Sequence, residues 1–166
     1  MANQLRGLKQ LASPISTSGK GVEFENDIQA LFLLTMLVDG ELPFLRNNEI
    51  ESLLFQAKWK GHDTDDLVIF SKQRQTGIEQ KLLIQIKLSV TFTESDVQFC
   101  ETIANAWSDF NNANFDKEND TILLITGPLS KIDIDNARSL FDDVLAFDSA
   151  KDFSTLSYKS IPTTKM

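Results

Sequence analysis

The chain has 166 residues, 42% of them hydrophobic, and a formal net charge of −8 with its one histidine neutral. This composition indicates one folded domain and excludes a disordered chain. The single cysteine, Cys100, excludes an internal disulfide, and its apolar neighbours predict a buried thiol. No signal peptide opens the chain, and its longest apolar run, 30–38, is far shorter than the roughly 20 residues that span a membrane. We therefore expect a cytoplasmic protein with no membrane partner.

The negative charge lies mainly in the second half of the chain. Residues 1–91 carry ten Lys or Arg and eleven Asp or Glu, whereas residues 92–166 carry six and thirteen. Because phosphate contacts usually come from a basic face, the composition argues against a nucleic-acid partner. The nearly neutral first half weakens that argument, so we expect a nucleic acid to bind this chain weakly.

The hydrophobic pattern divides the chain into an N-terminal segment (1–20), one domain (21–150) and a Ser/Thr-rich tail or linker to a missing C-terminal region (151–166). The first segment favours a short helix over 4–12. For the domain, the pattern predicts the following elements in chain order: a helix over 21–39 that stops at Gly40, strands over 52–58, 66–70 and 81–88, a helix over 93–112, a strand over 121–126 and a helix over 132–147.

Some of these elements carry further expectations. Thr93 is the expected cap of the helix over 93–112, and Trp107 belongs to its apolar stripe, so we expect this side chain in the core. The strand over 121–126 is continuously apolar, which is typical of a strand buried on both faces. A strand, a helix and a strand over 81–126 predict a parallel unit. The whole order predicts an α/β fold with a mixed central sheet flanked by helices.

Charged and amide side chains meet at the ends of two predicted strands. Period-two alternation places Leu83, Gln85 and Lys87 on one face of their strand. A lysine that is buried there needs a negative partner, which Asp65 or Asp66 supplies from the neighbouring strand. A carboxylate, an amide oxygen and a lysine at one sheet edge predict a site for a divalent metal and a phosphate.

Three short motifs occur on the elements that a known family would require. They are Gly21-Val22-Glu23-Phe24-Glu25, Thr64-Asp65-Asp66-Leu67 and Gln85-Ile86-Lys87. Over residues 19–130 their order resembles the restriction-endonuclease-like fold of PD-(D/E)XK nucleases, and within it the Mrr-like group and related effector endonuclease domains of bacterial anti-phage defence. The resemblance implies an endonuclease that depends on Mg²⁺ or Mn²⁺, cuts double-stranded DNA and forms a homo-oligomer through a region outside this chain.

The resemblance also assigns metal ligands. It favours Asp65 over Asp66 as the principal ligand, because in Mrr-like relatives one residue separates the metal aspartate from the apolar run. Gln85 would offer its side-chain carbonyl and Ile86 its backbone carbonyl to the same ion. A neutral amide is a weaker ligand than the acid that is more usual in the family, so the resemblance implies low metal affinity.

Two further charged residues are assigned to catalysis by the resemblance. Lys87 would hold the attacking water or stabilise charge on the phosphoryl group. Glu25, one helical turn before Gln29, would complete the site through a metal-bound water or a hydrogen bond to Lys87.

The segment just before the aspartates contains candidate DNA contacts. Lys58 and Lys60 flank Trp59. These three side chains could contact backbone phosphate and the duplex edge, or they could form an ordinary solvated strand end, and the sequence favours neither alternative. His62 is the chain's one histidine, and its single cysteine lies far away in the sequence, so we expect an ordinary loop histidine rather than a zinc ligand. Its closeness to Asp65 leaves a supporting or DNA-contact role open.

Two alternatives to a nuclease stay open. One is a catalytically degenerate member of the same fold that binds DNA or a partner without cutting, which the neutral Gln85 favours. The other is a protein-interaction module that docks through the acidic helix over 132–147, with Asp133, Asp135, Asp142 and Asp143.

Overall fold

The computed structural model describes residues 19–42, 44–45 and 47–145. The helix predicted over 4–12 and the tail predicted over 151–166 lie outside the described residues. The described residues form two compact units. The first consists of those up to Leu88 together with Thr102–Gly127, and the second consists of Ser89–Glu101 and those from Pro128 onward.

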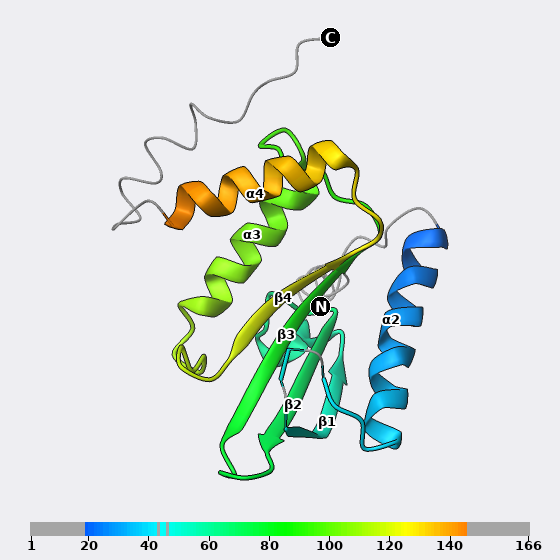
Figure 1. The fold of residues 1–166 in the computed structure, drawn as a ribbon, viewed down its shortest axis with the longest axis vertical. Helices are drawn as coiled ribbons and strands as arrows, with labels where there is room; N and C mark the ends of the chain where they lie inside the picture. The colour runs from blue at the N-terminus through cyan, green and yellow to red at the C-terminus, as the bar shows by residue number, and fades with distance from the viewer. Residues whose placement is uncertain (1–18, 43, 46, 146–166) are drawn as a thin grey trace, which may run out of the picture. The chain divides into compact units, whose positions relative to one another are not determined.

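The first unit is built on a four-stranded sheet (Figure 1). Its strands lie in the order β1 (Asn48–Phe55), β2 (Leu67–Gln73), β3 (Glu79–Lys87) and β4 (Thr121–Thr126). The β1–β2 and β2–β3 pairs are antiparallel, and the β3–β4 pair is parallel. The predicted α/β class with a mixed central sheet is therefore confirmed, as is the parallel pairing of the third and fourth strands.

Helix α2 (Gly19–Leu37) runs beside the sheet and covers one of its faces (Figure 1). Side chains at four-residue intervals, such as Phe24, Ile28 and Phe32, pack against core side chains of β2 and β3. The helix ends close to the predicted stop. Asp39 takes the left-handed conformation at φ 52°, and the Gly40 N–H donates to the Thr35 carbonyl at 2.8 Å.

The other face of the sheet carries a smaller apolar cluster. Val68 and Leu83 are buried there with Ala57, and Phe115 packs against them. Ile84 and Ile86 instead belong to the core on the α2 side, so the alternation that we predicted for β3 is confirmed. The strand β4 differs from the prediction, because all of its residues are half-buried. It is an edge strand of the sheet rather than a strand buried on both faces.

The first strand was wrongly placed at 52–58. β1 begins at Asn48 and ends at Phe55, and a 3₁₀-helix, η1 (Ala57–Lys60), follows it. The reason lies at Gln56, whose left-handed backbone (φ 51°, ψ 57°) ends the strand. Lys58 and Lys60 therefore lie on η1 and not on a strand.

Two helices contribute to the second unit. Of α3 (Val97–Phe110) only the residues up to Glu101 belong to it, whereas α4 (Lys131–Leu145) belongs to it entirely. The expected cap of α3, Thr93, is wrong. Asp96 caps the helix, because its Oδ1 accepts the N–H groups of Gln98 at 2.9 Å and Phe99 at 3.2 Å. Ser130 caps α4 by accepting the Asp133 N–H at 3.2 Å.

Two side chains of α3 lie at the surface, against expectation. Cys100 is exposed, with its Sγ 3.4 Å from the Glu94 carbonyl. Trp107 is 60% exposed and stacks on Phe110 instead of entering the core. Of the helices that the structure describes, none has the length and apolar character needed to cross a membrane.

Candidate functional site

Asp66 occupies the point where β2 begins and its pairing with β3 ends. The last pair of the β2–β3 ladder is Leu67 with Ile84, so the next residues of β3 have no strand partner on this side. The Asp66 carboxylate takes that place. Its Oδ2 accepts the Ile86 N–H at 2.7 Å and a hydrogen bond from the side-chain amide of Gln85. The carboxylate is thereby fixed at the open end of the ladder.

Lys87 completes this group from the same strand. Its Nζ lies 3.5 Å from Asp66 Oδ2, and its side chain is partly exposed. The structure therefore brings together three of the residues that the sequence singled out, namely Asp66, Gln85 and Lys87. The aspartate in contact with the other two is Asp66, whereas the sequence favoured Asp65.

Asp65 is also buried, but its contacts differ. Its backbone carbonyl accepts the Ala57 N–H at 2.7 Å, which ties η1 to the start of β2. Burial raises the pKa of the Asp65 carboxyl, and the charge of Asp66 raises it further. Lys58 and Lys87 act in the opposite direction. Asp65 thus feels the charges of the site without a hydrogen bond to Gln85 or Lys87.

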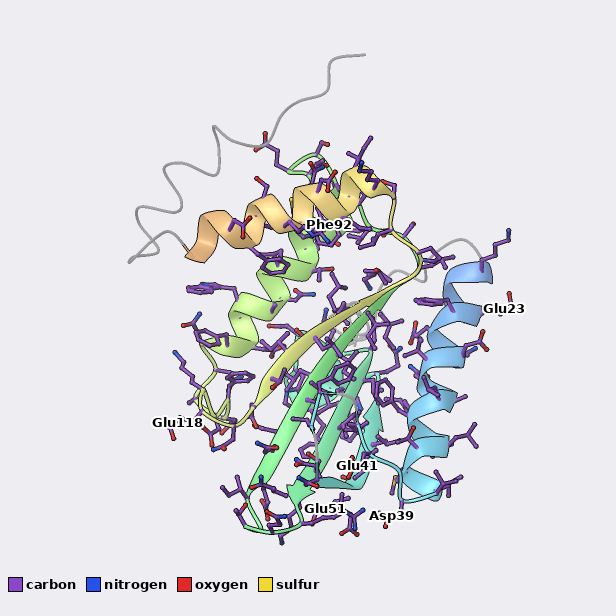
Figure 2. The ribbon with its side chains drawn as sticks, viewed as in Figure 1. Glu23, Asp39, Glu41, Glu51, Phe92 and Glu118 are labelled. Atoms are coloured by element: carbon purple, nitrogen blue, oxygen red, sulfur yellow. The ribbon has the colours of Figure 1, made fainter. Side chains whose placement is uncertain are left out.

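Glu25 approaches the site from α2. Figure 2 shows Glu23, two residues earlier and so on nearly the opposite side of the helix, pointing away from the sheet. Glu25 Oε1 instead accepts hydrogen bonds from the side-chain amides of Gln29 at 2.9 Å and Gln56 at 2.5 Å. The Gln29 amide also donates to the Asp66 carbonyl at 3.1 Å, so it joins α2 to the start of β2.

The environment of Glu25 favours its protonated form. Burial raises the pKa of its carboxyl, and the nearby charge of Asp66 adds to this effect. The charge of Lys87 and the two amide donors lower the pKa. The predicted hydrogen bond between Glu25 and Lys87 is not formed, and the two groups interact through charge alone.

Gln85 has one oxygen without a partner. The residue is only 4% exposed, and its Oε1 accepts no hydrogen bond. An unsatisfied buried acceptor is costly, and it points to a missing donor or cation. The Gln85 N–H₂ group now donates to Asp66 Oδ2. Gln85 Oε1 and Asp66 Oδ2 could therefore face one cation only after the Gln85 amide rotates by half a turn.

The oxygen donors at this position suit a hard divalent cation. The N–H and C=O groups of one strand residue point to the same side, so the Ile86 carbonyl also faces the open end of the ladder beside Asp66. Asp66, Gln85 and Ile86 thus offer carboxylate, amide and backbone oxygens, which Mg²⁺ prefers. Among the described residues no group of three or more His, Cys, Asp or Glu is arranged to hold a metal. The donor set therefore fits a weakly held ion.

A residue that the sequence did not single out holds the loop of the two aspartates. Asp109, near the end of α3, is 2% exposed, and its carboxylate accepts the N–H groups of Asp63 at 3.1 Å and Thr64 at 2.6 Å. Ser108 adds a hydrogen bond to the Asp63 carboxylate at 2.6 Å. An acid in the last turn of a helix opposes the helix dipole, and this was the one local sign of its role.

The predicted DNA contacts lie next to this loop. Lys58 and Lys60 are exposed on η1, and the Lys60 Nζ lies 4.8 Å from the centre of the Trp59 ring. His62 is half-buried and lines a surface hollow together with Lys60. All of these residues belong to the first unit, as does the rest of the candidate site.

Comparison of the chain with protein-family models, with curated proteins and with solved structures finds no match.

Proposed function

We propose that this chain is a metal-dependent endonuclease domain that hydrolyses phosphodiester bonds of DNA. The observation that carries the proposal is the Asp66 carboxylate in contact with Gln85, Ile86 and Lys87 at the open end of the β2–β3 ladder. The same residues form the motifs that resemble PD-(D/E)XK nucleases. The buried Gln85 Oε1 has no partner, and a half-turn of its amide would bring this oxygen beside Asp66 Oδ2, where a cation would satisfy both.

The residues divide the work of hydrolysis among them. Asp66, Gln85 and Ile86 would hold the ion, with Asp65 as a further acid close by. The chemistry that a bound Mg²⁺ or Mn²⁺ supplies is polarisation of the phosphoryl group and acidification of a water. The Lys87 ammonium offsets the charge that develops on the phosphoryl oxygens as water attacks phosphorus and the bond to the leaving oxygen breaks.

Glu25 is suited to hold or transfer a proton beside that group. Its raised pKa brings the carboxyl closer to neutral pH than an exposed glutamate, which favours proton exchange. The Gln29 and Gln56 amides both donate to its Oε1 and so hold the carboxyl in its present orientation.

The wider setting of the proposal rests on the resemblance. It implies a cytoplasmic effector of bacterial anti-phage defence that acts on double-stranded DNA as a homo-oligomer, with Lys58, Lys60 and His62 touching the substrate. Oligomerisation through a region outside this chain would raise the local concentration of the acidic domain on DNA and offset its weak binding.

The experiment that tests the proposal is cleavage of supercoiled plasmid with Mg²⁺ or Mn²⁺, with an EDTA control. Wild type should nick and linearise the plasmid, and Lys87→Ala should not, although its unfolding temperature stays close to that of wild type. Lys72→Ala is the matched control, because Lys72 is an exposed lysine farther along β2. Equal activity of Lys87→Ala and Lys72→Ala would contradict the assignment.

A catalytically degenerate module of the same fold is the second candidate. The observation that favours it is the Gln85 amide. This amide donates a hydrogen bond to the Asp66 carboxylate, which stabilises the carboxylate without a cation. This candidate predicts DNA binding that is unchanged by EDTA and no plasmid cleavage with any divalent metal.

A further inference from the structure

Both tryptophans of the chain are exposed on the first unit. Trp59 on η1 is 63% exposed, and Trp107 on α3 is 60% exposed. Large aromatic side chains are usually covered, so two of them at the surface point to a binding function. The Lys60 ammonium lies 4.8 Å from the Trp59 ring, and Trp107 stacks on Phe110 with ring centres 5.9 Å apart.

A surface hollow of about 230 Å³ lies between the segments that carry these tryptophans. Lys60 and His62 line it from the η1 side, and Asn112 and Phe115 line it from the segment after α3. The hydrogen bonds of Asp109 join the two segments, as described above. The Phe115 ring lies 5.7 Å from Phe110, so aromatic rings continue from Trp107 to the hollow. The hollow thus combines apolar rings with amide and imidazole groups.

The hollow adjoins the candidate site. Leu83 of β3 lines it, and Gln85 and Lys87 follow on the same face of that strand. Two residues of a strand span about 7 Å. Gln85 therefore lies about 7 Å along β3 from a residue that lines the hollow.

The positive charge at this surface comes from three lysines. Lys58, Lys60 and Lys117 form no ion pair with any residue that the structure describes, and the Lys117 ammonium lies 4.3 Å from the Phe110 ring centre. Lys81 at the edge of the hollow is neutralised by Asp120 at 2.9 Å. Lys60 thus lies beside the Trp59 ring and Lys117 beside the Phe110 ring, and a nucleic-acid strand likewise offers a base and a phosphate side by side.

We propose that this surface, Trp59, Lys60, Trp107, Phe110 and the hollow between them, binds an unpaired DNA strand. Bases stack on the two tryptophans, and one base enters the hollow, where Asn112 and His62 can bond to its edge. A duplex hides its base faces, so stacking selects the unpaired strand. In the proposed nuclease function the unpaired strand is a locally opened segment of the duplex substrate, and its presentation to Asp66 and Lys87 rests on that function. The binding itself does not.

Intrinsic fluorescence tests the binding directly, because the chain has no tryptophan outside this surface. The full chain is titrated in EDTA with a short oligothymidylate and, separately, with the duplex that this strand forms with oligoadenylate. The single strand should quench the fluorescence and bind at least about five-fold more tightly than the duplex, since stacking contributes on the order of 1–3 kcal/mol per base. Equal or tighter binding of the duplex would overturn the proposal.

Variants then locate the binding. In anisotropy titrations of labelled oligothymidylate, Trp59→Ala and Trp107→Ala should each weaken binding about five-fold or more, and Trp107→Phe should restore most of the loss. Phe44→Ala is the control, because Phe44 is an exposed aromatic between Leu42 and Leu45 of the α2-side core. Variants that fold like wild type and bind like the control would refute the surface. A chain that binds the single strand but cuts no plasmid would support the surface and refute the nuclease.

Discussion

The buried Asp109 carboxylate offers a sharp test of how the aspartate loop is held. Two backbone N–H groups, of Asp63 and Thr64, donate to it, and the residue is only 2% exposed although it lines the hollow beside η1. Asp109→Ala removes both acceptors and leaves two donors unpaired. Asp109→Asn keeps one acceptor oxygen, so it removes about half of the interaction.

The expected loss of stability follows from these two bonds. A hydrogen bond to a charged group contributes about 1.5–3 kcal/mol, and a buried donor without a partner costs about 1–3 kcal/mol. Because Asp63 is partly exposed, water satisfies its donor in part, and we place Asp109→Ala at about 3 kcal/mol and Asp109→Asn at about 1.5 kcal/mol. The loop carries Asp65 and Asp66, so DNA cleavage should fall even where the variant is fully folded.

Urea unfolding measures the loss as a change in midpoint at constant slope. Glu118→Ala is the control, because Glu118 is an exposed acid in the loop before β4 (Figure 2) and should leave the midpoint unchanged. If Asp109→Ala were as stable as Glu118→Ala, the carboxylate would not anchor the loop and the reasoning would fail.

Two further predictions concern the acids of the site. Because burial and Asp66 raise the pKa of Asp65, the folded chain binds more protons than the unfolded chain between the two pKa values, and stability falls as the pH rises through that window. Asp65→Asn should therefore raise the melting temperature in EDTA at neutral pH, with the gain vanishing in acid; a lower melting temperature at neutral pH would contradict this. Gln56→Gly removes an amide donor of Glu25, but it also relieves the strain of the left-handed backbone at this position. These two effects oppose each other, so the unfolding free energy should change by less than about 1 kcal/mol. The kcat for cleavage should fall at unchanged KM. Asn47→Gly, at φ 61° outside the site, is its control, and a Gln56→Gly enzyme with the kcat of this control would remove Gln56 from the mechanism.

Much of the fold could be predicted because the relevant signals are local. The alternation in β3 placed Gln85 and Lys87 on one face, and the continuous apolar run predicted β4 at its observed bounds. The prediction of the α3 cap was wrong because Thr93 and Asp96 are both good cap residues, and the local sequence does not distinguish between them. The prediction that β4 is buried on both faces was wrong because an edge strand can have the same apolar run as a central strand.

The site divides in the same way. Alternation along β3 predicted Gln85 and Lys87 beside an aspartate of the neighbouring strand, and both side chains contact Asp66. Gln56 and Asp109 were missed because their partners lie 31 and 45 or 46 residues away, and the neighbouring sequence does not identify those partners. Which of Asp65 and Asp66 contacts Gln85 and Lys87 depends on where the β2–β3 ladder ends. That end is set by the register of the sheet and not by the motif.

The most direct test of the central claim is the position of Mn²⁺ in crystals of the full chain, read from its anomalous scattering. We expect one ion in contact with an Asp66 carboxylate oxygen and Gln85 Oε1, with the Gln85 amide rotated by half a turn from its position in the metal-free chain, and no ion in crystals of Asp66→Asn. A Gln85 amide that still donates to Asp66 in saturating Mn²⁺, with no ion at the open end of the β2–β3 ladder, would contradict the proposed site and with it the nuclease.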